Sequence, residues 1–204
     1  MASVTLATRT ETGDLVDRVV DATLACIART GLSKLTVDDV ARAAGASRAT
    51  IYRAFPSKSA LLTTMVAREA DRVTAAVRTA ASGAATLEDA VTTVILVGVR
   101  ELRASAALQF VVAHEPERLL PFLSFAGGDR LYRAIALRLA PVFAPWCPDP
   151  ERAAEWVARV GLCLLFTPQP MVDLDDAGAL RRFVSTFVTP GLAGPVRPSR
   201  FEEV

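Results

Sequence analysis

Residues 42–58 carry four basic side chains and no acidic one, although the whole chain of 204 residues has a formal net charge of only +1. The basic residues are Arg42, Arg48, Arg53 and Lys58. Guanidinium and ammonium groups bind phosphate oxygens, and a guanidinium also fits the edge of guanine. The basic residues of this segment therefore predict that it recognises an anionic partner.

A short helix over residues 48–55 would give this segment two different faces. At about 100° per residue, Ile51 and Phe55 point to one side, as residues that enter a core do. The opposite side carries small, hydroxyl and guanidinium groups, flanked by a phenol: Arg48, Ala49, Thr50, Tyr52 and Arg53. These groups suit base edges and phosphates in a major groove.

The preceding residues predict a second short helix and a tight turn. Thr36 is followed three residues later by Asp39, which is typical of a helix start. Gly45 permits a positive φ in the turn, and Ser47 can cap the next helix. Helix, glycine turn and capped basic helix together predict a helix-turn-helix. Periodicity alone leaves DNA binding and a merely solvated basic face about equally open.

The rest of the chain follows the 3.6-residue period of helices and has almost no period-two alternation, so we predict an all-α fold. The predicted organisation is a flexible tail over 1–12, a helix-turn-helix domain over 13–57, a ligand-binding and dimerisation bundle over 58–188, and a second flexible tail over 189–204. The helices expected in the bundle cover 58–81, 87–103, 106–114, 116–123, 129–139, 150–166 and 174–188.

Residues 15–62 resemble the N-terminal domain of the TetR family of regulators. The resemblance is carried by TVDDVARAAGASRATIYRAFPSKSALL, Thr36 to Leu62. It implies an N-terminal DNA-binding domain, an all-helical C-terminal domain and a homodimer, and it favours DNA binding strongly over a solvated basic face. One departure is Ala54, where many relatives have His, and this leaves the operator sequence open.

The resemblance also implies which side chains meet double-stranded DNA. The phosphate contacts are expected from Thr36, Tyr52 and Lys58, and the base or adjacent phosphate contacts from the first turn of the following helix. The full set of expected DNA-binding residues is Thr36, Ser47, Arg48, Ala49, Thr50, Tyr52, Arg53 and Lys58. An isologous dimer would set two recognition helices about 34 Å apart, which predicts a palindromic operator.

The C-terminal half is expected to hold an apolar effector and the dimer contacts. The proposed effector is a hydrophobic small molecule, oriented by few polar groups. The candidate ligand residues are Arg100, Gln109, Phe110, His114, Phe122, Phe125, Tyr132 and Trp156. Small and apolar residues of the last two helices predict the dimer interface: Ala154, Val157, Ala158, Gly161, Leu165, Phe183 and Phe187. The alternative interpretation of His114 is a helix C-terminal residue, and of the bundle a packed core without ligand.

Several classes of function fit the sequence poorly. A single histidine, His114, and no glycine-rich phosphate loop give no support to an enzyme, a metal site or a bound cofactor. No apolar run is long enough to span a bilayer and no signal peptide is visible, so we expect a cytoplasmic protein. Cys26 and Cys163 are expected in the core, with Cys147 the most reactive thiol. A transcriptional activator or a ligand-independent DNA-binding protein is the alternative to a repressor.

Overall fold

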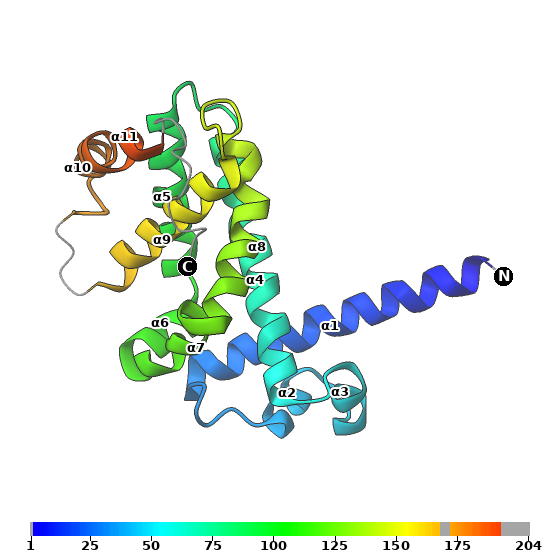
Figure 1. Ribbon diagram of the computed structural model, residues 1–204. Helices are drawn as coiled ribbons and strands as arrows, with labels where there is room; N and C mark the ends of the chain where they lie inside the picture. The colour runs from blue at the N-terminus through cyan, green and yellow to red at the C-terminus, as the bar shows by residue number, and fades with distance from the viewer. Residues whose placement is uncertain (1, 168–171, 193–204) are drawn as a thin grey trace, which may run out of the picture. The chain divides into compact units, whose positions relative to one another are not determined.

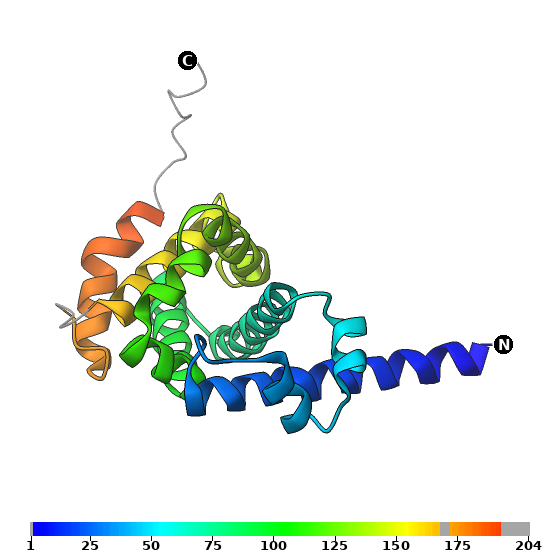
Figure 2. The same cartoon turned by 90° about the horizontal axis from the view of Figure 1, so that it is seen from below.

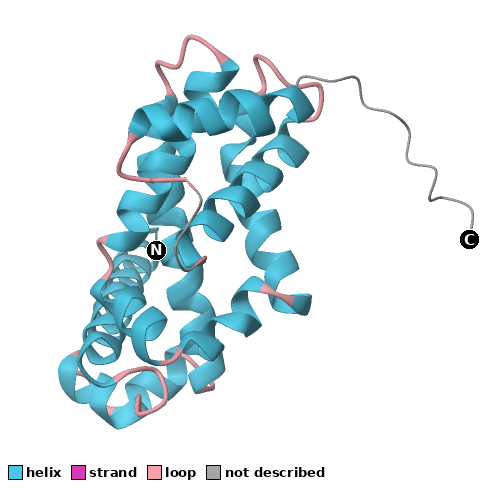
Figure 3. Ribbon diagram, turned by 90° about the vertical axis from the view of Figure 1, so that its left-hand side faces the viewer, coloured by secondary structure: helices cyan, strands magenta, loops and turns pink. Residues whose placement is uncertain are grey.

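The computed structural model describes residues 2–167 and 172–192, and within these ranges it contains helices and loops but no strand (Figure 1 and Figure 3). The all-α prediction is therefore confirmed. The helices are α1 (Ala2–Thr30), α2 (Val37–Ala43), α3 (Arg48–Ala54), α4 (Lys58–Ala81), α5 (Leu87–Arg103), α6 (Ala106–His114), η1 (Pro116–Leu119), α7 (Leu120–Leu123), α8 (Phe125–Phe143), α9 (Pro150–Phe166), α10 (Ala177–Phe183), η2 (Val184–Val188) and α11 (Thr189–Leu192).

The chain forms two compact units. Unit 1 consists of Met1–Glu69 and Arg103–Phe125, and unit 2 consists of Ala70–Leu102 and Ala126–Val204. Unit 1 is therefore larger than the segment 13–57, because it also contains the first turns of α4 and the segment from α6 to α7. α4 runs through the boundary between the units without interruption.

The core of unit 1 forms where α1 to α4 and α6 bury their apolar faces. α6 packs against α1, and both are visible in the view from below (Figure 2). The large buried side chains are Val19, Ile27, Leu35, Val40, Ile51, Phe55, Leu61 and Val111. Each such side chain contributes roughly 1.5–3 kcal/mol by leaving water. The short helices α2 and α3 depend on this burial, because seven-residue helices are unstable alone.

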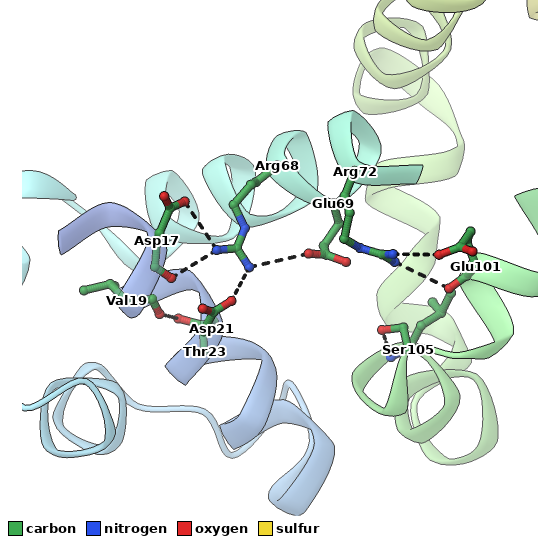
Figure 4. Close-up of polar contacts among 10 residues, drawn as sticks. Asp17, Val19, Asp21, Thr23, Arg68, Glu69, Arg72, Glu101 and Ser105 are labelled. Carbon is green, nitrogen blue, oxygen red and sulfur yellow. Dashed lines mark hydrogen bonds and ion pairs between the residues drawn. The ribbon is translucent and has the colours of Figure 1, made fainter. Parts of the chain in front are cut away.

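Arg68 of α4 fastens α4 to α1 within unit 1 (Figure 4). Its Nη1 donates to the backbone oxygen of Asp17 at 3.0 Å, and its Nη2 donates to Asp21. Nη2 also lies 3.6 Å from Glu69. One turn later on α4, in unit 2, Arg72 donates to Glu101 of α5 at 2.8 Å. Within unit 1, Arg68 therefore holds α4 to α1, and within unit 2, Arg72 holds α4 to α5.

The core of unit 2 is built from α4, α5, α8, α9 and the C-terminal helices. α5 buries one broad face, made mostly of valines together with Ile95, from Val91 to Val99. Phe143 of α8 and Val157 of α9 are fully buried in the same core. Pro141 lies inside α8, which extends beyond the predicted 129–139 at both ends. A proline there removes one hydrogen bond to the carbonyl of Leu137 without ending the helix.

Near both ends, described residues that the sequence predicts to be tail are helical, while residues 193–204 of the second predicted tail lie outside the described residues. α1 begins at Ala2, so residues 2–12, expected to be a tail, are helical. No proline interrupts them, and each residue added to an existing helix gains a hydrogen bond. At the other end, helix continues past Val188 to Leu192. The turn η2 is π-helical, with Thr189 N–H bonded to Val184, which widens the helix just before Pro190.

The three cysteines are free, but the burial of two of them is the reverse of what the sequence predicts. Cys147 is buried, and this burial raises the pKa of its thiol, so it is not the most reactive one. Cys163 is exposed on α9 instead of lying in the core. Among the described residues, no helix is both long and apolar enough to cross a membrane.

Candidate nucleic-acid interface

α3 has a buried side and an exposed side, as its sequence predicts. Ile51 is 1% exposed and Phe55 is 4% exposed, and both lie in the core of unit 1. Arg48, Ala49, Tyr52 and Arg53 are exposed, and Thr50 is partly exposed. The helix therefore cannot turn its basic side inward without removing two large apolar side chains from the core. Figure 1 shows α2 and α3 beside the first turns of α4.

The two helices are held by capping side chains that also belong to the expected DNA contacts. Thr36 Oγ1 accepts the N–H of Asp39 at 3.1 Å and donates to the Asp39 carboxylate. Ser47 Oγ accepts the N–H of Thr50 at 3.1 Å and lies 2.8 Å from the Thr50 hydroxyl. Both residues are exposed, so their hydroxyls face solvent while they fix the helix starts. Gly45, between the helices, has a φ of +62°.

The basic side chains differ in how they are held. Arg48 Nε lies 2.7 Å from Asp38 Oδ1 of α2, and Arg42 donates to Asp39 at 3.3 Å. Arg53 has no charged partner among the described residues, and its side chain is directed to solvent. One guanidinium of the α3 face is therefore held in place and another is free.

Lys58, expected to contact phosphate, is directed into unit 1. Its Nζ donates to the backbone oxygens of Leu32 and Leu35, at 3.1 and 2.7 Å. Burial lowers the pKa of this ammonium, as does the charge of Arg118, while Glu115 acts in the opposite direction. Two of its three protons are therefore used to hold the loop between α1 and α2, and only one is available to an outside acceptor.

Sequence reasoning missed Glu115, which holds the same loop from the other side. Its carboxylate accepts the N–H groups of Leu32 and Ser33, at 2.7 and 3.1 Å. Burial disfavours the charged form, but these hydrogen bonds and Arg118 outweigh it and lower the pKa of Glu115. No local signal could have identified this contact, because 83 residues separate Glu115 from Leu32.

The candidate effector residues are divided between the two units. On α6, Gln109 and His114 are exposed, and the His114 ring packs against Phe110 at 4.6 Å between centroids. Phe122 is partly buried in unit 1. In unit 2, Arg100 is exposed and pairs with Glu101 at 3.3 Å. The side chain of Phe125 lies outside the described residues.

Tyr132 and Trp156, the two remaining effector candidates, lie in unit 2 in different surroundings. Tyr132 is only 7% exposed, and the guanidinium of Arg159 lies 4.0 Å from its ring centroid. Trp156, in contrast, is 49% exposed. α9 presents the Trp156 side chain to solvent and buries its neighbour Val157, and the role of Trp156 in ligand binding stays a prediction.

The same orientation of α9 contradicts two of the expected dimer contacts. Ala154 and Val157 are completely buried inside unit 2, where they contact core residues of the same chain. They cannot touch a partner subunit without unfolding, so they are not interface residues. Ala158, Gly161, Leu165 and Phe183 are partly buried, and Phe187 is 71% exposed with its ring 5.6 Å from that of Phe183.

The amino-acid sequence of the chain is similar to those of known DNA-binding regulators. Residues 19–65 match a family described as "Bacterial regulatory proteins, tetR family". The chain is 30% identical over 190 residues to an HTH-type transcriptional regulator of Mycobacterium tuberculosis, covering 92% of this chain and 91% of the relative. It is 32% identical over 184 residues to the HTH-type transcriptional regulator AlkX of the same species, covering 85% and 84%.

Solved structures share the fold. The repressor AlkX from Dietzia, described as implicated in biodegradation of n-alkanes, superposes with a TM-score of 0.68 at 20% identity, covering 86% of this chain and 98% of that one. The fatty acid degradation regulator FadR from Bacillus halodurans superposes with a TM-score of 0.60 at 19% identity, covering 89% and 96%. At these identities the likeness establishes the architecture alone.

Proposed function

Because the chain belongs to the TetR family of DNA-binding transcriptional regulators, which are not enzymes, we propose that it is a homodimeric repressor released from a palindromic operator by a hydrophobic small molecule. The observation that carries the DNA part is the two-sided α3. Ile51 and Phe55 anchor it in the core, while Arg48, Tyr52 and Arg53 face outward. The proposed place of action is the cytoplasm.

The proposed readout divides the exposed groups by chemistry. Arg48 and Arg53 have guanidinium groups that fit guanine O6 and N7, and Ala49 offers a methyl group to thymine. Thr36, Ser47, Thr50 and Tyr52 supply hydroxyls for phosphates, which fix register and not sequence. Lys58 contributes through its one remaining proton, with its other two on Leu32 and Leu35.

The proposed dimer uses the outer surfaces of α9 and of the helix from α10 to α11. After the correction of Ala154 and Val157, this surface retains Ala158, Gly161, Leu165, Phe183 and Phe187. A phenylalanine exposed to 71% is costly in water, since its burial is worth roughly 1.5–3 kcal/mol. A two-fold pairing of identical surfaces would bury this ring on both subunits at once.

The proposed effector step is a population shift along α4. This helix belongs to unit 1 up to Glu69 and to unit 2 from Ala70. An effector in unit 2 that prefers one position of α4 would change the spacing of the two recognition helices and lower the affinity for operator. The walls of such a site would be apolar, because α5 supplies mainly Val and Ile to unit 2.

The test is capture of genomic DNA fragments by the purified protein at a stated salt concentration, followed by motif discovery. A palindrome near a few promoters is expected, and Arg48→Ala should weaken its binding about tenfold or more while leaving the dimer intact. Binding that depends on salt but not on sequence would overturn the proposal. Fatty acids, acyl-CoA esters and n-alkanes are the first effector probes, and reporter output with and without them separates repressor from activator.

A further inference from the structure

We infer that Asp38 is a positioning residue that orients Arg48 for guanine recognition, a role that rests on the proposed function of α3. Asp38 lies in the first turn of α2, and Arg48 is the first residue of α3. Arg48 Nε lies 2.7 Å from Asp38 Oδ1, and Asp38 is the only partner that Arg48 has among the described residues. The contact bridges the two helices of the helix-turn-helix.

The two neighbouring acids of α2 have different tasks. Asp39 accepts the Thr36 hydroxyl and pairs with Arg42, so it caps and stabilises its own helix. Asp38 takes no part in the cap. Its Oδ1 is covered from solvent and makes no hydrogen bond within the described chain, so its contact with Arg48 is an ion pair and not a directed hydrogen bond. As an acid in the first turn, Asp38 also favours the N-terminus of α2, and its side-chain contact is with Arg48.

The geometry of a guanidinium explains why such a pair would favour base reading. Arginine has donors along two edges, one that includes Nε and one formed by Nη1 and Nη2. The contact of Asp38 is with Nε, and in the proposed complex the edge formed by Nη1 and Nη2 donates to guanine O6 and N7. The Arg48 side chain is still 65% exposed, so this edge is accessible. Held in advance, the side chain loses less rotamer entropy on binding.

A competing possibility predicts the opposite effect of Asp38 on DNA affinity. A carboxylate on a DNA-facing surface repels phosphates, and an ion pair that must break before binding would lower affinity. If Asp38 masked Arg48, replacing the acid by its neutral amide would strengthen DNA binding. If Asp38 positions Arg48, the same replacement would weaken binding even though it removes a negative charge. The direction of the change therefore decides between the two.

The experiment is a double-mutant cycle on the operator recovered by DNA capture, using the full-length protein, Asp38→Asn, Arg48→Ala and the double variant. Asp38→Asn should weaken operator binding about 3- to 10-fold when Arg48 is present, and should not weaken it when Arg48 is alanine. The ratio of specific to nonspecific affinity should fall by a similar factor. Replacing the contacted guanine by 7-deazaguanine should cost the wild type more than it costs Asp38→Asn.

The controls separate the possible failures. Glu117→Gln on η1 makes the same change of charge at an exposed acid of unit 1 and should leave operator binding unchanged. Circular dichroism and the thermal midpoint check that Asp38→Asn keeps its fold. Stronger or unchanged binding by Asp38→Asn, with Arg48→Ala still impaired, would overturn the positioning role alone. Unimpaired binding by Arg48→Ala would instead overturn the proposed assignment of Arg48.

Discussion

Glu115 accepts the backbone N–H of Leu32 at 2.7 Å, although these residues are 83 positions apart in the chain. Lys58 donates to the backbone oxygen of the same residue at 3.1 Å. The loop that ends α1 and leads to the Thr36 cap of α2 is therefore bound by a carboxylate on its N–H groups and by an ammonium on its carbonyls. A segment beyond α5 thus completes the support of the proposed DNA-reading helices.

Glu115→Gln should lower the urea midpoint at neutral pH, because the amide loses the charge that strengthens its hydrogen bonds to Leu32 and Ser33. The pKa of Glu115 is lowered in the folded state. Its contribution is therefore complete above the unfolded-state pKa, about 4.3, and is lost as the pH falls through the lowered folded-state pKa. The difference between wild type and variant should shrink below about pH 4. Glu117→Gln is the control, and a gap that stays constant with pH would contradict this role.

Gly31→Ala should destabilise the protein by roughly 2–4 kcal/mol. Gly31 has a φ of +82°, and a Cβ there would lie 2.7 Å from Glu115 Oε1 and 2.8 Å from Phe110 Cε1. Gly45→Ala separates the two causes, because Gly45 has a φ of +62° but open space around it, and should cost only about 1–2 kcal/mol. Urea unfolding of both variants measures the difference. Equal losses of unfolding free energy would mean that the contact with Glu115 contributes nothing to the cost of Gly31→Ala.

Arg68→Gln should lower the free energy of unfolding by about 1 kcal/mol. The side chain is 27% exposed and binds both the backbone of Asp17 and the carboxylate of Asp21 (Figure 4). Arg78→Gln, on the same helix but exposed and without a partner in the described residues, should change it by less than about 0.5 kcal/mol. Denaturation monitored by circular dichroism would compare them, and similar losses would exclude a special role for Arg68.

Phe187→Asp should shift the protein from dimer to monomer in light scattering at micromolar concentration. The exposed ring is the most accessible large apolar side chain of the proposed interface, and a carboxylate at its place would be buried without a partner. Leu137→Asp offers a matched control, because Leu137 is also exposed, at 53%, but lies on α8. A Phe187→Asp protein that stays dimeric would move the interface away from this surface. A wild type that is monomeric would refute the homodimer itself.

The sequence alone determined the features that depend on neighbours in the chain. The capping pairs of Thr36 with Asp39 and of Ser47 with Thr50, the glycine turn at Gly45 and the two-sided α3 follow from spacing along a helix. These rules act over three or four residues, so a reader of the sequence can apply them before any fold is known. The all-α class follows in the same way from the period of the apolar residues.

Only the tertiary structure decided which contacts form between distant segments. The rotation of α9, which buries Val157 and exposes Trp156, depends on the shape of the core that it meets, and both side chains are apolar enough to fit either side. Likewise, the tertiary fold brings Glu115 and Lys58 to one loop, and it brings Asp38 to Arg48. Periodicity specifies that a helix has an apolar face, but packing against the rest of the chain selects which residues that face buries.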